Sequence, residues 1–484
     1  MGLDPGLRRL ALGTLLAAYP GPVPPDWAVD LLADGLAGHT LFGTNVHDPA
    51  QLAASTAALR AGRPDVLIAI DEEGGDVTRL AHATGSPYPG NAALGAIGDV
   101  ALTRRVYQSI GAELAALGIT VNLAPTVDVN TADDNPVIGT RSFGADPVRV
   151  AAHSAAAVTG LQAAGVAACA KHFPGHGATV TDSHHELPTV DAPLSLLRQR
   201  DLPPFAAVVA AGARAVMTAH IRVPALTGSD PATFSRAVLV DLLRAEYGFT
   251  GVVITDALEM KGAAVAAGGV GPAAVRALAA GADLLCIGAT VDAELVELVA
   301  AEIVDALSDG RLATVRVEEA AGRTAELAAW TRAAVGSPTT DDTDLGYAAA
   351  RRAVRVDGVL TGLDQPLVVH LHTESTIAEG RVPWGLGPHL DGVQELRVIA
   401  TEADPSSLRA LAGDRPIVLV GRHLHRLPGG PELINGLAAQ HAVTVVEMGW
   451  PAQWRPTGVR AFVTTYGASH ANGRAAAEAL GLTR

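Results

Sequence analysis

The sequence predicts a (β/α)8 barrel of the TIM type followed by a smaller α/β sandwich domain. Three observations support this prediction. Short apolar runs alternate with alanine- and leucine-rich stretches over roughly the first 330 residues, polar side chains stand at the ends of several of these runs, and a second series of apolar runs follows a polar segment. Continuous apolar strands separated by helices are typical of a parallel sheet covered by helices.

Eight apolar runs are expected to be the barrel strands. They lie at residues 15–20, 39–43, 66–71, 120–125, 166–172, 215–220, 252–257 and 284–289. Eight strand-plus-helix units make up a barrel of this type, and extra loop residues enlarge it. The barrel is therefore predicted to occupy residues 1–335.

A second domain is predicted after a linker. Residues 336–345, GSPTTDDTDL, are polar and turn-forming, so we assign them to the linker. Five further apolar runs follow at residues 367–372, 395–400, 416–421, 442–449 and 460–467. Helical stretches separate most of them, and residues 346–484 are therefore expected to form an α/β sandwich.

Composition excludes several functions. A chain of 484 residues with 49% apolar residues can bury a large core, and its length favours two domains. The net charge of −15 argues against a nucleic-acid or anionic-membrane partner, because both require a basic surface. The apolar run near the N-terminus is too short for a membrane span and has no convincing cleavage site, so we expect a cytoplasmic protein.

The cysteines and lysines are few. Cys169 and Cys286 both lie within apolar runs and are expected to be buried packing residues; no disulfide, metal or cofactor is predicted. Arginine supplies 33 of the 35 basic residues, and the only lysines are Lys171 and Lys261. A position that keeps lysine in such a chain favours a compact ammonium group over a guanidinium fork.

Polar residues collect at the carboxyl ends of the predicted strands. Asp71, Lys171, His172, His220 and Asp256 all take this place. Barrel enzymes build their active sites at that end, because the strand-to-helix loops converge there. The pattern therefore predicts an active site among these residues.

Residues 171–188, KHFPGHGATVTDSHHELP, contain the most informative motif. His172 and His176 are four apart, a spacing that binds metal on a helix, but Pro174 disfavours a helix here. Asp182 and His184 fit an acid/base dyad better, since a carboxylate two residues away can orient an imidazole and raise its basicity. An unrelated surface pair is the alternative.

Two weaker motifs precede this loop. In residues 71–80, DEEGGDVTRL, a carboxylate at a strand end is followed by two glycines, which let the backbone turn beside a ligand or form an ordinary strand–turn–helix junction. In residues 135–147, Arg141 follows the fourth strand, where it would hold sugar hydroxyls, a carboxylate or only solvent. Asp146 and Pro147 predict a helix start.

A fourth motif, VVITDALEMKG at residues 252–262, places Asp256 at the end of an apolar strand. A carboxylate there is rigidly held and partly desolvated, as a nucleophile in glycoside hydrolysis requires. A helix N-cap is the competing role for Asp256.

Taken in the order of the sequence, the four motifs resemble the N-acetylglucosaminidase branch of glycoside hydrolase family 3, in its two-domain form. The resemblance covers the whole barrel. It implies that Asp256 is the nucleophile and that His184, with Asp182, is the general acid/base. It further implies a set of residues that bind the terminal sugar: Asp71, Arg79, Arg141, Lys171 and His172, with Asp128 and His220 as weaker candidates that could also be supports.

One position departs from the family pattern. Where this branch commonly reads GGRV, the chain has Gly74-Gly75-Asp76-Val77. An acidic group replaces a basic one near the expected pocket, which puts the binding of the aglycone side in doubt. Arg79 is in place, so the grip on the terminal sugar need not change.

The resemblance implies a retaining exo-β-N-acetylglucosaminidase that cleaves N-acetylglucosamine from cell-wall fragments, as in peptidoglycan recycling, or from chitin fragments. Three alternatives stay open. A histidine acid/base brings no negative charge near the anomeric carbon, so phosphate could replace water as acceptor and make the enzyme a phosphorylase. A β-glucosidase of the same family would take a glutamate from the second domain. An inactive sugar-binding barrel would bind without turnover.

Overall fold

The computed structural model describes residues 4–288, 291–334, 336 and 344–483. The chain forms two compact units that are each discontinuous in sequence. The first comprises Met1–Glu72, Thr103–Asn130 and Ala145–Thr340, and the second comprises Glu73–Leu102, Thr131–Gly144 and Asp341–Arg484. The predicted linker falls largely on residues 337–343, which lie outside the described residues.

The first unit contains a barrel of parallel strands. The strands are β1 (Leu15–Ala17), β2 (Gly38–Leu41), β3 (Leu67–Ile70), β4 (Val121–Asn122), β5 (Ala167–Phe173), β6 (Ala215–Thr218), β7 (Val252–Thr255) and β8 (Leu285–Ile287). They pair in the order β7-β6-β5-β4-β3-β2-β1-β8. A parallel bridge between Ile254 and Leu284 joins the two outer strands, so the sheet closes on itself.

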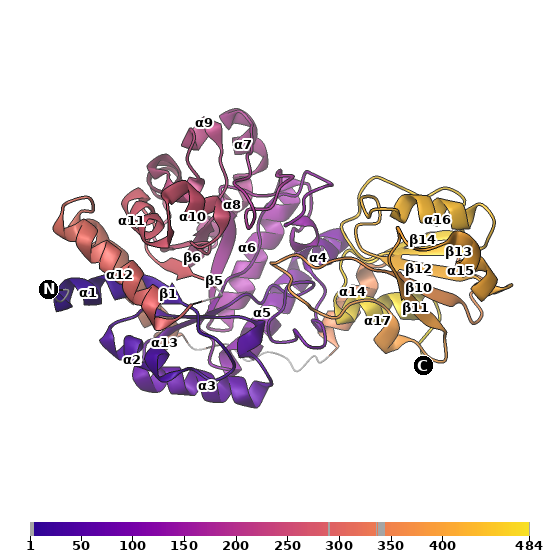
Figure 1. Cartoon of the computed structure of the whole chain (residues 1–484), viewed down its shortest axis with the longest axis horizontal. Helices are drawn as coiled ribbons and strands as arrows, with labels where there is room; N and C mark the ends of the chain where they lie inside the picture. Colours follow the sequence, from indigo (N-terminus) through magenta and orange to yellow (C-terminus); the bar gives the residue numbers. More distant parts are fainter. Residues whose placement is uncertain (1–3, 289–290, 335, 337–343, 484) are drawn as a thin grey trace. The chain divides into compact units, whose positions relative to one another are not determined.

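Helices follow the strands and lie around the barrel (Figure 1). They are α1 (Pro5–Leu12), α2 (Asp26–Asp34), α3 (Pro49–Gly62), α5 (Val100–Ala116), α6 (Pro147–Ala163), α7 (Leu194–Arg200), α8 (Pro203–Ala210), α9 (Pro224–Thr227), α10 (Lys261–Ala267), α11 (Val270–Ala280), α12 (Ala293–Ser308) and α13 (Thr314–Ala333). Short turns η1 (Gly43–Asn45) and η3 (Ala232–Phe234) and the π-helix η4 (Ala237–Glu246) complete the unit.

Helix starts follow local chemistry. Asp146 caps α6 by accepting the main-chain N–H groups of Val148 and Arg149, and Pro147 takes the first helical position. The helix start predicted at Asp146-Pro147 is thereby confirmed. Asp256, in contrast, caps no helix, because α10 begins at Lys261 with Met260 at its N-cap.

Alternate residues of the strands form one buried cluster. Leu67 and Ala69 of β3, Ala167 and Cys169 of β5, and Val252 and Ile254 of β7 belong to it, and Leu327 and Ala328 of α13 pack against them. Side chains two apart on a strand point to the same face, so this cluster fills the barrel interior. The rest of each strand packs against the helices.

The second unit has a six-stranded sheet of order β11-β10-β12-β13-β14-β9. Its strands are β9 (Arg355–Gly358), β10 (Leu367–Leu371), β11 (Glu395–Val398), β12 (Ile417–Gly421), β13 (Val443–Glu447) and β14 (Ala461–Thr464). Its helices are α4 (Asn91–Ile97), α14 (Leu345–Ala353), α15 (Pro405–Ala412), α16 (Gly430–Ala438) and α17 (His470–Ala479), with short turns η2 (Gly139–Arg141) and η5 (Gly387–His389).

This sheet is the middle of three layers. One set of alternate strand residues, including Val369 and Leu419, packs with Ile434 of α16, while the other set packs with Ala476 of α17. Every strand pair is parallel except β14 with β9, which is antiparallel.

The sequence prediction of fold class is confirmed, because both series of apolar runs form the parallel strands of a barrel and of a second sheet. Cys169 and Cys286 are buried and unbridged, as expected. Strand β9 was not predicted, since its sequence RVDG is exposed along its whole length and has no apolar run. Within the described residues no single helix is long and apolar enough to cross a membrane; α10 and α11 meet that length and composition only as a pair bent by 93°.

Candidate active site

Three of the predicted site residues continue the inward alternation of the barrel strands. Asp71 comes two residues after Ala69, Lys171 two after Cys169, and Asp256 two after Ile254. Their side chains are therefore expected on the inner side at the carboxyl end of the barrel. The electrostatics agree: Asp71 and Asp256 both act to raise the pKa of the buried Cys169 thiol, after burial itself, while Lys171 acts to lower it.

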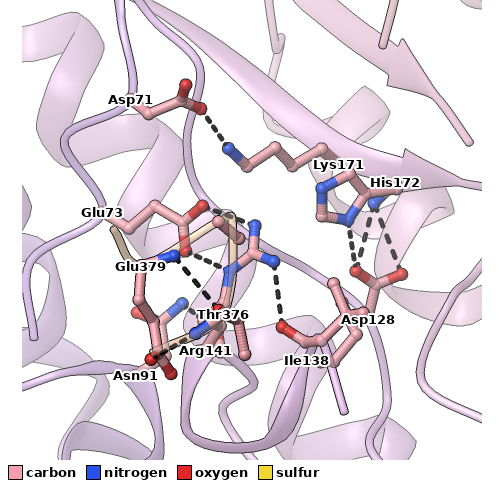
Figure 2. A network of polar contacts seen from close by, with 12 residues as sticks. Asp71, Glu73, Asn91, Asp128, Ile138, Arg141, Lys171, His172, Thr376 and Glu379 are labelled. Atoms are coloured by element: carbon pink, nitrogen blue, oxygen red, sulfur yellow. Dashed lines mark hydrogen bonds and ion pairs between the residues drawn. The ribbon is translucent and has the colours of Figure 1, made fainter. Parts of the chain in front are cut away.

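Lys171 and Asp71 form an ion pair. The Lys171 ammonium Nζ lies 2.6 Å from Oδ1 of Asp71, and Figure 2 shows the lysine side chain extended toward the carboxylate. The lysine side chain is 3% exposed and that of Asp71 is 17% exposed. The pair offers N–H donors beside a carboxylate acceptor, a combination that suits neighbouring hydroxyl groups.

Asp128 holds two histidines at once. Its Oδ2 lies 2.8 Å from Nδ1 of His172, and its carboxylate also accepts the main-chain N–H of His172 (Figure 2). The main-chain N–H of His176 donates to Oδ1 at 2.6 Å. Burial would raise the pKa of Asp128, but the charge of His172 and the hydrogen bonds from both histidines outweigh it and hold the pKa below its usual value.

The loop after β5 carries a dyad. Nδ1 of His184 lies 2.6 Å from Oδ1 of Asp182, and the same oxygen accepts the main-chain N–H of His184 at 2.9 Å. Burial opposes ionisation of Asp182, yet the hydrogen bonds from His184 keep its pKa below the usual value. A carboxylate can only accept, so Nδ1 carries hydrogen and Nε2 is left for proton transfer.

Asp256 is partly exposed and directly follows β7. Its Oδ1 accepts the main-chain N–H of Ala257 at 2.8 Å. Burial would raise its pKa, but the positive charges of His220, His172 and His184 outweigh burial, so the pKa of Asp256 lies below its usual value. An ionised carboxylate at a rigid strand end is a competent nucleophile.

His220 is buried with both ring nitrogens occupied. Nδ1 lies 2.8 Å from Oγ1 of Thr233, and Nε2 lies 3.0 Å from the carbonyl oxygen of Ala257. Burial lowers its pKa despite the nearby Asp256. These contacts fit a residue that supports the Asp256 segment, the role that the sequence had left open beside sugar binding.

Arg141 lies in the second unit and is paired with Glu73. Its Nε and Nη2 lie 3.0 and 2.8 Å from the two carboxylate oxygens, a bidentate pair of two buried side chains. Nη1 donates to the carbonyl oxygen of Val137, and Asn91 donates to the carbonyl oxygen of Arg141 (Figure 2). The guanidinium group is thereby fixed in orientation.

Arg79 also lies in the second unit. Its Nη2 donates to the carbonyl oxygen of Ala378 at 2.8 Å, and Nη1 to that of Glu379 at 3.3 Å. The carboxylate of Glu379 is buried and lies 3.1 Å from Nη1 of Arg422. Burial raises the pKa of Glu379, and Arg422 partly offsets it. Residues 73–80 are thus anchored to the segment after β10.

Asp76, which departs from the family pattern, is a connecting residue. Its Oδ2 accepts the hydroxyl of Thr140 at 2.6 Å, and its Oδ1 accepts the main-chain N–H of Ala468 at 2.7 Å. Ala468 lies between β14 and α17. An arginine has no acceptor, so it could not make either contact. The acidic residue therefore links three segments of the second unit.

Several residues that contact the site residues were not predicted from the sequence. Glu73 lies within the first motif but was not singled out as the partner of Arg141, and Thr179 and Ser183, which both contact His176, lie within the central loop. No pattern in the sequence pairs these residues. His176 was weighed only as a metal ligand; among the described residues no three His, Cys, Asp or Glu side chains are grouped to hold a metal ion.

Comparisons with known proteins show which family the chain resembles. The N-terminal domain of glycosyl hydrolase family 3 matches residues 25–327. Beta-hexosaminidase A of Pseudoalteromonas piscicida is 36% identical over 386 residues, which are 72% of this chain and 64% of that protein. A beta-hexosaminidase of Chromobacterium violaceum is 42% identical over 257 residues, 52% of this chain and 71% of that one.

Among solved structures, a glycoside hydrolase family 3 beta-N-acetylglucosaminidase from Paenibacillus sp. str. FPU-7 superposes with a TM-score of 0.88 at 32% identity. The match covers 99% of this chain and 97% of that one. The two-unit architecture is therefore shared over essentially the full length of both chains.

Proposed function

This chain belongs to glycosyl hydrolase family 3, and we propose that it is a retaining β-N-acetylglucosaminidase that removes terminal N-acetylglucosamine. The named relatives support the sugar, since they are beta-hexosaminidases and a beta-N-acetylglucosaminidase. The observation that carries the mechanism is the Asp182–His184 contact of 2.6 Å on the loop after β5. Fragments of cell wall or chitin that end in this sugar are the proposed substrates.

In the first half-reaction, a carboxylate oxygen of Asp256 attacks the anomeric carbon and the bond to the leaving oxygen breaks. His184 donates its Nε2 proton to that oxygen, so the alcohol leaves neutral. The low pKa of Asp256 keeps the nucleophile ionised. The glycosyl group is then an ester of Asp256.

In the second half-reaction, Nε2 of His184 takes a proton from water as the water oxygen attacks the anomeric carbon. Asp256 leaves as a carboxylate, and the sugar is released with its original β configuration. Asp182 accepts a hydrogen bond from Nδ1–H of His184 in both half-reactions and stabilises the imidazolium form of His184.

Other predicted residues of the barrel would bind the sugar. The Lys171–Asp71 pair and the His172 ring, held by Asp128, present fixed donors and acceptors at the carboxyl end of the barrel. The family resemblance also implies sugar-binding roles for Arg79 and Arg141.

Two measurements test the proposal. Asp256→Ala should lower kcat on an aryl N-acetyl-β-glucosaminide by on the order of 10⁴-fold or more, because the covalent route is lost. Proton NMR of the wild-type reaction should show the β anomer of N-acetylglucosamine first. Substantial activity in the variant, or the α anomer as first product, would refute the mechanism.

Phosphorolysis is the second candidate, favoured by the imidazole that stands where most retaining enzymes have a second carboxylate. A phosphate oxygen could attack the anomeric carbon of the glycosyl ester without repulsion from an acid/base carboxylate; the bond to Asp256 would break and the sugar 1-phosphate would form. Product analysis with and without phosphate separates the two reactions: a phosphate-independent rate and free sugar alone support hydrolysis.

A β-glucosidase would need a glutamate from residues 346–484 as proton donor. Glu447 is buried, its pKa is raised to about 7 chiefly by burial, and its carboxylate accepts the main-chain N–H groups of His423, Leu424 and Gly449. These contacts suit a structural carboxylate. Cleavage of an aryl glucoside at a rate comparable to that of the N-acetylglucosaminide would favour this alternative.

A further inference from the structure

His176 connects both halves of the loop that carries the dyad. Its ring is buried, with Nδ1 2.7 Å from Oγ1 of Thr179 and Nε2 3.1 Å from Oγ of Ser183. Ser183 stands between Asp182 and His184 in the sequence. The imidazole of His176 therefore holds the residue at the centre of the dyad.

The hydrogen bonds around His176 have a consistent direction. The Thr179 hydroxyl donates to the carbonyl oxygen of His176 at 3.0 Å, so its oxygen accepts hydrogen from Nδ1. Nε2 is then the acceptor for the Ser183 hydroxyl. This assignment needs a neutral ring, and burial, followed by the charge of His172, lowers the pKa of His176 to about 4.

The same histidine is tied to the barrel through Asp128. The main-chain N–H of His176 and the ring of His172 both donate to that carboxylate, which has no exposed surface. Asp128 lies two residues after Thr126, which forms a parallel bridge with Lys171 of β5, so its main chain is held at the barrel wall. One buried carboxylate thus anchors a predicted sugar-binding residue and the base of the dyad loop.

The main chain of Ser183 has a second attachment. Its carbonyl oxygen accepts the main-chain N–H of Gly262 at 3.3 Å, at the start of α10. A Cβ at position 262 would lie 3.2 Å from that oxygen and 3.1 Å from Cβ of His220, so the approach is close. The segment that contains Gly262 begins at Asp256, and the loop and the nucleophile segment meet here.

We propose, on the basis of the acid/base role proposed for His184, that His176 is a positioning residue that sets His184 relative to Asp256. A chain of hydrogen bonds joins Asp128 to the main-chain N–H of His176, and the ring of His176 to the Ser183 hydroxyl. Ser183 is held from its other side by Gly262, and its neighbours Asp182 and His184 are thereby placed above the barrel. His176 itself touches no reacting atom.

The test uses leaving groups of different acidity. A 2,4-dinitrophenyl glycoside leaves with little protonation, whereas a 4-methylphenyl glycoside needs the general acid. His176→Phe keeps a buried ring but loses both hydrogen bonds. It should lower kcat/KM on the 4-methylphenyl substrate by on the order of 10²-fold and on the dinitrophenyl substrate by less than about 10-fold. Ser183→Ala, which removes one bond, should shift the same ratio by a smaller factor.

His153→Phe is the matched control. His153 is also buried and bonds a threonine hydroxyl, with Nδ1 2.8 Å from Oγ1 of Thr103, but it lies in α6. The His153→Phe variant should change the values of kcat/KM on the two glycosides by the same factor. If His176→Phe and Ser183→Ala also change them equally, the positioning role is overturned; if His184→Ala shows no leaving-group dependence, the proposed acid/base function itself fails.

Discussion

At the amino-terminal end of the barrel, Asp283 is enclosed by three arginines, whereas at the carboxyl-terminal end Asp71 pairs with a lysine and Asp128 and Asp182 pair with histidines. Asp283 has no exposed surface and pairs with Arg244, Arg316 and Arg323, and it also accepts the main-chain N–H of Val253 in β7. Every lone pair of that carboxylate is engaged. Its place beside β7 and β8 stabilises the strands that close the barrel.

The carboxyl-terminal end gives its carboxylates partners of another kind. Asp71 has the Lys171 ammonium, Asp182 has His184, and Asp256 accepts a main-chain N–H while remaining partly exposed. Ammonium and imidazole groups can release or transfer protons, and a guanidinium group cannot. Lys171, one of only two lysines in a chain with 33 arginines, pairs with Asp71 at this end. Its position agrees with this difference between the two cations. Asp283 at one end holds strands together, and Asp71 and Asp182 at the other end pair with groups that can exchange protons.

The largest expected effect on stability is at Asp283. Asp283→Asn removes the negative charge shared by three partly buried guanidinium groups, of which Arg316 also pairs with Glu319, and breaking a buried pair costs about 3–5 kcal/mol. Urea unfolding should show this loss, while kcat at a temperature where the variant is folded stays close to wild type. Asp309→Asn is the control, because Asp309 pairs with Arg311 at the exposed surface and should change stability little. Equal losses in both variants would remove the special role of Asp283.

The next effect is on rate and concerns Asp182. Asp182→Asn keeps an acceptor for Nδ1 of His184 but loses the negative charge that stabilises the imidazolium form. We expect kcat/KM on a poorly activated substrate to fall by on the order of 10²-fold, with little change in Tm. A variant that instead loses stability and keeps its rate would show that the two ends of the barrel do not differ as described.

The barrel could be predicted because its information is local. Each strand is a continuous apolar run, and the inward alternation from Ala69 to Asp71 or from Ile254 to Asp256 is legible in the sequence. Contacts between distant segments could not be predicted from the sequence. Asp76 accepts a hydrogen bond from the main-chain N–H of Ala468, 392 residues away, and a main-chain partner can belong to almost any residue type. His176 was recognisable as polar, but its hydroxyl partners depend on how the loop folds.

The smallest effect is a shift in the pH profile. The pKa of Asp256 lies below its usual value, so the nucleophile stays ionised. Protonation of Asp256 should therefore lower kcat/KM only at a pH below the ordinary carboxyl range. After burial, which favours the neutral acid, the charge of His220 is the largest influence and lowers the pKa. His220→Gln removes that charge, raises the pKa of Asp256 and should move the acid limb of kcat/KM to higher pH. An acid limb that stays in place or moves lower would contradict the electrostatic role of His220 and leave it with a structural role, like that of Asp283 at the opposite end of the barrel.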